Sequence, residues 1–170
     1  FEQYLNNKKR GINRFKNNTI VNYKYLILGN CLVLKSIFTK ISFNERLVGY
    51  GGGDLEFGYN INQLYPNQIR CCSKAVVIRK NHPGFKKQIC RYYGFGKNNF
   101  NFIDKKNQLS LLGKFYYLPD FKFVVCLCKL FFVLFKKTYS LNISFLNFYV
   151  VRFTLGFSIL LGKLKSNNIK

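Results

Sequence analysis

Residues 49–62 read GYGGGDLEFGYNIN and place five glycines around the carboxylates of Asp54 and Glu56. The chain holds 28 Lys and Arg but only 6 Asp and Glu, so a third of its acid lies in this stretch. Glycine adopts positive φ and lets backbone approach a ligand closely. A carboxylate held there can act as a general base or bind a metal. We therefore predict the chemical centre here, with Asp54 as its main acid; the alternative is that Asp54 is the N-cap of a helix over residues 54–64.

The composition describes a folded chain of about one domain. Its 170 residues are 48% hydrophobic and 18% aromatic, which excludes an intrinsically disordered protein. Methionine is absent even at position 1, so we expect the C-terminal piece of a longer protein. The six cysteines form no CxxC pair and there is one histidine, which argues against a structural zinc site. Free thiols in a reducing compartment are expected.

The net charge of +22 favours an anionic partner. Lysine outnumbers arginine 21 to 7, and the Lys, Asn, Ile, Phe and Tyr content is typical of AT-rich codons. Proteins that read bases or phosphates favour arginine, and the basic residues here are spread along the whole chain. We therefore do not expect nucleic acid as the main partner. An anionic membrane surface or a phosphorylated donor fits the charge as well.

Apolar runs and turn residues predict both strands and helices. Residues 23–34 are predicted to form a buried strand and a turn, with Gly29 and Asn30 at the turn, and residues 75–79 to form a second buried strand. Helices are predicted over residues 35–41, 54–64 and 85–100, the last breaking at Gly94 and Gly96, and near the N-terminus before Gly11.

The tail from Phe121 is apolar and basic, and three arrangements are open for it. Residues 143–161 would just span a bilayer, but Arg152 at mid-span is costly. Helices lying in the membrane interface, with lysines reaching the headgroups, are favoured. A buried helical hairpin is the other alternative.

The order of motifs along the chain resembles the acceptor half of family 2 glycosyltransferases. The resemblance rests on residues 35–85 (KSIFTKISFNERLVGYGGGDLEFGYNINQLYPNQIRCCSKAVVIRKNHPGF), on RYYGFGK at 91–97 and on the GN turn at 29–30. It implies an α/β fold, the C-terminal part of a GT-A-like (Rossmann-like) domain, over residues 1–120. Residues 121–170 would follow as a basic, apolar helical tail.

The resemblance implies an inverting glycosyltransferase that moves a sugar from a nucleotide-diphosphate donor to a polysaccharide or lipid-linked acceptor. Asp54 would be the general base, and His82 would lie near a divalent metal, Mn or Mg. Substrate contacts are expected from a further set: Gly51, Gly52, Gly53, Glu56 and Asn30.

Two features depart from the family pattern. Gly53 stands where the family usually has Glu, and the nucleotide-binding half with its DxD motif is not in this sequence. We therefore expect no catalysis from this chain alone, and a cytoplasmic location at the inner face of the cell membrane. The competing class is a basic RNA-binding structural protein, such as an organellar ribosomal protein.

Overall fold

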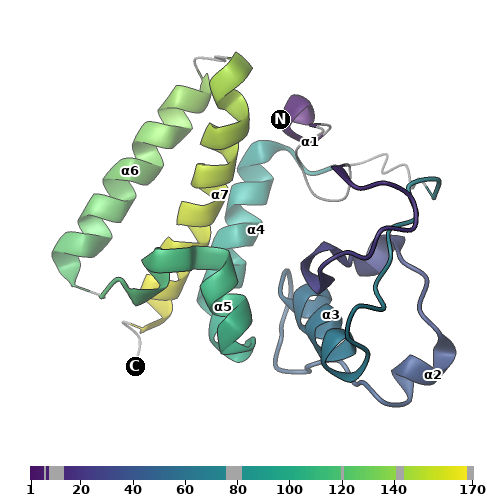
Figure 1. Ribbon diagram of the computed structural model, residues 1–170. Helices are drawn as coiled ribbons and strands as arrows, with labels where there is room; N and C mark the ends of the chain where they lie inside the picture. Colours follow the sequence, from purple (N-terminus) through teal and green to yellow (C-terminus); the bar gives the residue numbers. More distant parts are fainter. Residues whose placement is uncertain (6, 8–13, 76–81, 120, 141–143, 168–170) are drawn as a thin grey trace.

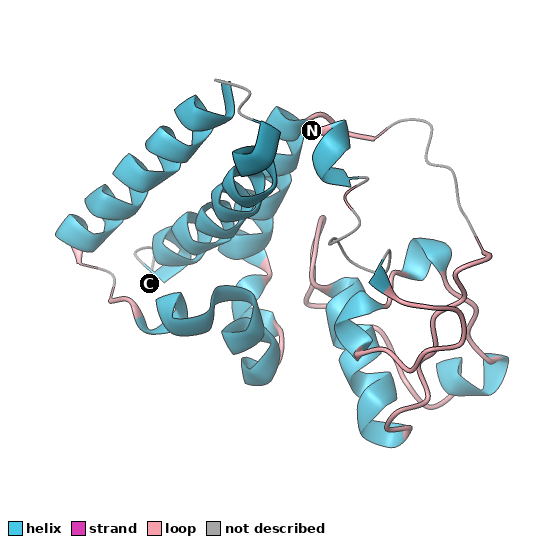
Figure 2. Cartoon of the chain, turned by 45° about the horizontal axis from the view of Figure 1, so that its top comes forward, coloured by secondary structure: helices cyan, strands magenta, loops and turns pink. Residues whose placement is uncertain are grey.

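Helices and turns make up the structure, a computed structural model that describes residues 1–5, 7, 14–75, 82–119, 121–140 and 144–167 (Figure 1, Figure 2). These ranges contain no strand of a sheet, and their extended pairing is an isolated antiparallel bridge between Ile20 and Arg70. The predicted α/β, GT-A-like fold is therefore wrong.

The strand predicted within residues 23–34 is absent, and the segment forms two 3₁₀ turns, η2 (Tyr23–Tyr25) and η3 (Leu28–Asn30). The second of these confirms the turn predicted at Gly29 and Asn30. The apolar side chains of the segment pack against Phe57 and Ile61 of α3 (Gly53–Leu64). A helix offers an apolar surface but no free backbone groups, so the segment satisfies its own N–H and C=O groups by turning. Of the other predicted strand, residues 76–79 lie outside the described residues.

Two helices predicted in the N-terminal half are confirmed. α3 spans Gly53–Leu64, and a short helix, α2 (Lys35–Phe38), precedes it. The rings of Phe38 and Phe43 lie against the buried ring of Phe57, at centroid distances of 5.4 Å and 4.7 Å. At the N-terminus, α1 covers Glu2–Leu5, and the expected stop at Gly11 lies outside the described residues.

The C-terminal half is a helical bundle in which α7 (Ser144–Asn167) packs against both α4 (Phe85–Asn98) and α6 (Lys122–Ser140) (Figure 1). The chain between α4 and α6 is also helical, comprising η4 (Phe100–Phe102), α5 (Lys105–Leu112) and η5 (Gly113–Tyr117). The bundle core consists of fully or nearly fully buried side chains, among them Phe95, Phe100, Leu160 and Leu164.

α4 runs without interruption through Gly94 and Gly96, so the predicted break there is wrong. Gly96 lies where α4 crosses α7, and a Cβ atom there would overlap the carbonyl of Ile159. On the other helix, a Cβ at Gly162 would lie 2.7 Å from the backbone nitrogen of Lys97. These glycines therefore let the two helix backbones touch, and their role is packing rather than chain reversal.

The tail forms an antiparallel hairpin of α6 and α7 (Figure 1). α7 is largely buried: Val151 and Leu164 are fully enclosed, and the Nζ atom of Lys163 donates to the carbonyl of Tyr116 at 2.6 Å. α6 is buried on one face only. Among the described helices, none combines the length and the apolar character needed to cross a membrane.

Candidate functional site

The glycine turn is held in place by Asn99 at the C-terminal end of α4. Gly51 and Gly52 have φ of 93° and 97°, which favours glycine strongly. The buried Asn99 side chain accepts a hydrogen bond from Val48 N at 3.0 Å and donates one to Gly51 O at 2.9 Å. A Cβ at Gly51 would lie 2.9 Å from the Phe95 ring, so protein fills the space on that side of the turn.

Asp54 is the second residue of α3 and is exposed to solvent. The N-cap is Gly52, so the alternative that Asp54 caps the helix is wrong by two positions. Its carboxylate nevertheless lies in the first turn, where the helix dipole favours negative charge. Oδ1 accepts a long hydrogen bond, 3.4 Å, from Leu28 N. Because Leu28 and Asn30 share the turn η3, the structure places the predicted site residue Asn30 near Asp54.

Glu56 has a structural partner. Its Oε2 atom accepts hydrogen bonds from Asp104 N at 3.1 Å and from Asn107 Nδ2 at 3.5 Å, which joins α3 to the start of α5. Asn107 also accepts from the hydroxyl of Tyr23 at 2.8 Å. The pKa of Tyr23 is raised above its ordinary value of 10.0, mainly because the hydroxyl is buried and to a smaller extent because Tyr59 lies nearby. These hydrogen bonds connect the N-terminal half of the fold with α5. No sequence pattern could have predicted that Glu56 accepts a hydrogen bond from Asp104 N.

Gly53 and His82 complete the predicted set. Gly53 is the first residue of α3, and a Cβ there would meet no atom within 4 Å. His82 is exposed before α4, with its ring 5.6 Å from that of Phe1 and Nδ1 2.9 Å from Pro83 O. The described residues bring no three His, Cys, Asp or Glu side chains together in a group that could hold a metal ion. The predicted Mn or Mg thus finds no assembled site there and stays a prediction.

A second candidate site lies on α6, which forms one edge of the bundle (Figure 1). One side of this helix carries five exposed apolar side chains, here called the outer face: Phe123, Leu127, Leu130, Phe131 and Leu134. Their exposed fractions run from 40% at Leu127 to 77% at Phe123. Their spacing places them on one face of a helix. Val133 is exposed beside them, and the exposed Lys137 lies on the same side at the C-terminal end of the helix. The opposite face, which includes the buried Cys128, packs against α7, and burial raises the pKa of the Cys128 thiol.

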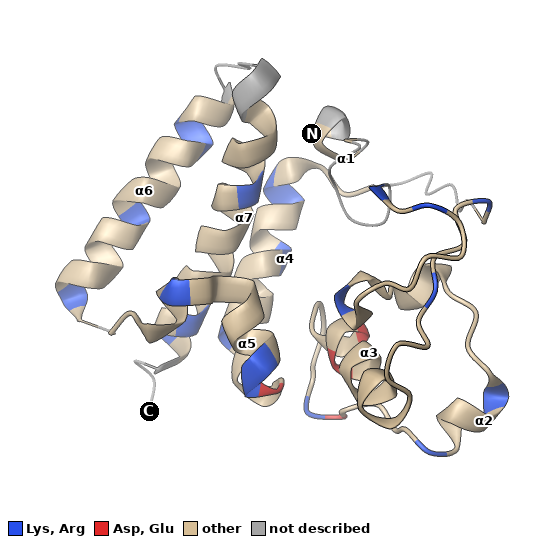
Figure 3. Cartoon of the chain, in the orientation of Figure 1, with Lys and Arg blue, Asp and Glu red and all other residues tan. Residues whose placement is uncertain are grey.

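Three exposed lysines border the outer face along one edge of α6. Lys122, Lys129 and Lys136 are spaced by seven residues, so they align along the helix. Figure 3 shows basic residues along α6 and no acidic residue on it. Residues 121–170 contain eight Lys and Arg and no Asp or Glu. The solvent-exposed side of α6 is therefore mainly apolar, with lysines along its edge and Lys137 at its C-terminal end.

The run of residues 121–135 predicted an apolar, basic helix, and its helical spacing could have identified the outer face. The glycosyltransferase resemblance and the predicted enzymatic role stay predictions, because no protein-family model, no curated protein and no solved structure matches the chain.

Proposed function

We propose that this chain binds anionic membrane surfaces through α6, with the outer face entering the boundary between headgroups and acyl chains. The observation that supports this most is the row of exposed apolar side chains, from Phe123 to Leu134, on one face of one helix. Contiguous exposed apolar surface marks a binding site more often than scattered apolar residues do. Helices that lie in the membrane interface have this pattern, with lysines at the border.

The charge on α6 favours a lipid surface over other occupants. Lys122, Lys129 and Lys136 would lie at headgroup depth when the outer face enters the bilayer. Each lysine near an anionic surface contributes about 1 kcal/mol. A second copy of this chain would bring the same positive charge to the interface and repel it. RNA would pair with the lysines but would leave the apolar side chains in water.

The apolar contribution is of similar size. Burying a whole Leu or Phe side chain stabilises by about 1.5–3 kcal/mol. The five side chains of the outer face are roughly half exposed on average. Their transfer into lipid would therefore contribute on the order of 5 kcal/mol before the cost of confinement at the surface.

Co-sedimentation with lipid vesicles tests this proposal. We expect the chain to bind vesicles of phosphatidylcholine with phosphatidylserine more tightly than vesicles of phosphatidylcholine alone. The variant Leu130→Gln/Leu134→Gln should bind at least tenfold more weakly. The matched control is Leu32→Gln/Leu34→Gln, which changes two leucines that are 102% and 73% exposed outside the bundle.

Equal vesicle binding by both double variants would overturn the proposal. So would binding of the wild-type chain to a single-stranded RNA, with clear sequence or structure preference and an affinity that falls steeply with salt, without binding to anionic vesicles; this result would replace the membrane by nucleic acid.

Glycosyl transfer is a second candidate function, and the exposure of Asp54 at the start of α3 favours it. An exposed carboxylate is available to an acceptor hydroxyl, whereas Glu56 is engaged by Asp104 N. The candidate depends on this local arrangement alone, since the sheet of the GT-A fold is not present in the described residues. Loss of a general base typically costs about 10²–10⁴-fold in rate.

Its test requires a protein in which a nucleotide-binding half is joined to this chain, because no catalysis is expected from this chain alone. The test measures the release of nucleotide diphosphate from a nucleotide-diphosphate sugar, with a lipid-linked or polysaccharide acceptor and Mn or Mg. Asp54→Asn should abolish the release, and Glu56→Gln, if folded, should retain it. Turnover that is unchanged in Asp54→Asn would sink the assignment of the base.

A further inference from the structure

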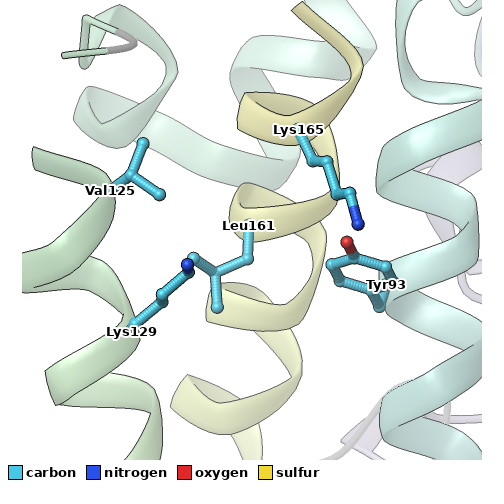
Figure 4. A pocket seen from close by; sticks show the side chains of 5 residues that line it. All are labelled: Tyr93, Val125, Lys129, Leu161 and Lys165. Atoms are coloured by element: carbon cyan, nitrogen blue, oxygen red, sulfur yellow. The ribbon is translucent and has the colours of Figure 1, made fainter. Parts of the chain in front are cut away.

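A cavity of about 310 Å³ lies among the three long helices of the bundle (Figure 4). Five side chains line it: Tyr93 of α4, Val125 and Lys129 of α6, and Leu161 and Lys165 of α7. Val125 and Leu161 form an apolar wall. The other three contribute a hydroxyl and two ammonium groups, and none of the five is acidic. The cavity therefore combines apolar side chains with polar groups, two of which are cationic.

The two lysines come to this cavity from different helices. Lys129 and Lys165 are exposed, and within the described residues neither has a carboxylate partner. Figure 4 shows the ammonium of Lys165 directed toward the hydroxyl of Tyr93. Two positive charges at one cavity repel each other, and an anion placed there removes the repulsion and gains attraction to both.

We propose that this cavity binds a phosphate monoester that carries an apolar group. The phosphate oxygens would accept hydrogen bonds from Lys129, Lys165 and Tyr93, while the first carbons of the apolar group lie against Val125 and Leu161. Lysine is a common phosphate ligand and acts as a point charge. Ligand pockets span about 300–1,000 Å³. A cavity of about 310 Å³ therefore accepts a headgroup and a few carbons rather than a whole lipid.

The position of the cavity connects it to the membrane-binding face. Lys129 belongs both to the lysine edge of α6 and to the cavity lining. If the outer face of α6 lies in a bilayer, the cavity is at headgroup depth, and a lipid phosphate reaches it without leaving the surface. This step rests on the proposed membrane function, whereas the phosphate chemistry of the cavity does not.

Calorimetric titration in the absence of vesicles tests the cavity directly. The probes are dihexanoyl phosphatidic acid below its micelle concentration, hexyl phosphate, glycerol 3-phosphate and inorganic phosphate. We expect Lys165→Gln to weaken binding of dihexanoyl phosphatidic acid at least tenfold, and Tyr93→Phe to weaken it less. The matched control is Lys136→Gln, which removes a lysine from the same edge of α6 but outside the cavity, and it should bind as the wild type does.

The two amphiphilic probes separate the sources of the phosphate. Both outcomes support the proposal: preference for dihexanoyl phosphatidic acid identifies a lipid, and equal binding of hexyl phosphate identifies a soluble apolar phosphate ester. Glycerol 3-phosphate or inorganic phosphate binding as tightly as the amphiphiles would overturn it, as would equal weakening by Lys165→Gln and Lys136→Gln.

The cavity and the membrane proposal fail separately. Leu130→Gln/Leu134→Gln leaves the cavity lining intact, so it should bind dihexanoyl phosphatidic acid normally while losing vesicle binding. A wild-type chain that binds the soluble lipid but no vesicles would refute the membrane function alone. A chain that binds anionic vesicles but none of the phosphate probes would refute the cavity alone.

Discussion

The contact between α4 and α7 predicts a large cost for adding a single methyl group at either glycine of the crossing. In Gly162→Ala the new Cβ would lie 2.7 Å from Lys97 N and 3.0 Å from Gly96 C. Favourable contacts between carbon atoms are about 3.5–4.0 Å. The obstructing atoms belong to backbone and cannot rotate away, so the helices must separate.

The magnitude follows from what separation does to the core. Overpacking usually costs about 1–3 kcal/mol, and Gly162→Ala should reach or exceed the upper end because it also loosens Leu160 and Leu164. Gly96→Ala should cost as much. In the double variant the costs should not add, since one separation of the helices relieves both overlaps.

Urea denaturation followed by circular dichroism measures these free energies of unfolding. The matched controls are Gly94→Ala in α4 and Gly156→Ala in α7, where a Cβ would meet no atom within 4 Å. Each control should be neutral or stabilising by up to about 1 kcal/mol, because alanine favours a helix interior. Equal stability of Gly162→Ala and Gly156→Ala would refute the close crossing of α4 and α7.

Three further predictions concern buried groups and the two sides of α6. Cys126 is exposed and Cys128 is 4% exposed with a raised pKa, so iodoacetamide should modify Cys126 first, as mass spectrometry would show; the reverse order would contradict the orientation of α6. Because the folded chain disfavours ionised Tyr23, its free energy of unfolding should fall as pH rises above 10.0, and chemical denaturation should show a smaller fall in Tyr23→Phe; parallel curves would contradict the burial of this hydroxyl. Asn99→Ala leaves Val48 N and Gly51 O without their partner, so it should lower the free energy of unfolding by about 2–4 kcal/mol, as urea denaturation would show. A decrease below about 1 kcal/mol would contradict the role of Asn99 in holding the turn.

Local sequence signals were sufficient for several helices. The carboxylates after a glycine turn predicted the start of α3, and the long apolar run predicted the helices of the tail. In these segments the residues that form the helix are also the residues whose pattern predicts it, so no distant contact is needed to predict it. The exposed position of Asp54 near the start of α3 also follows from this local pattern.

The errors arise where distant residues decide the outcome. An apolar run such as residues 23–34 fits a strand or a turn packed on a helix, and the choice depends on whether a partner strand exists. Gly96 resembles a helix breaker until Gly162 is known to face it. The hydrogen bond of Glu56 with Asp104 and the cavity shared by Lys129 and Lys165 likewise bring together positions far apart in the chain. No spacing rule predicts such pairs.

Membrane binding by the outer face of α6 is tested most directly by placing a fluorophore on it. The chain contains no tryptophan, so Phe123→Trp introduces a single indole at a position that is 77% exposed. On addition of vesicles containing phosphatidylserine, its emission should shift to shorter wavelength, and high salt should reduce the shift. Leu32→Trp, at a fully exposed position outside the bundle, should show no shift. No shift at position 123, or the same shift at both positions, would contradict a membrane surface bound through α6.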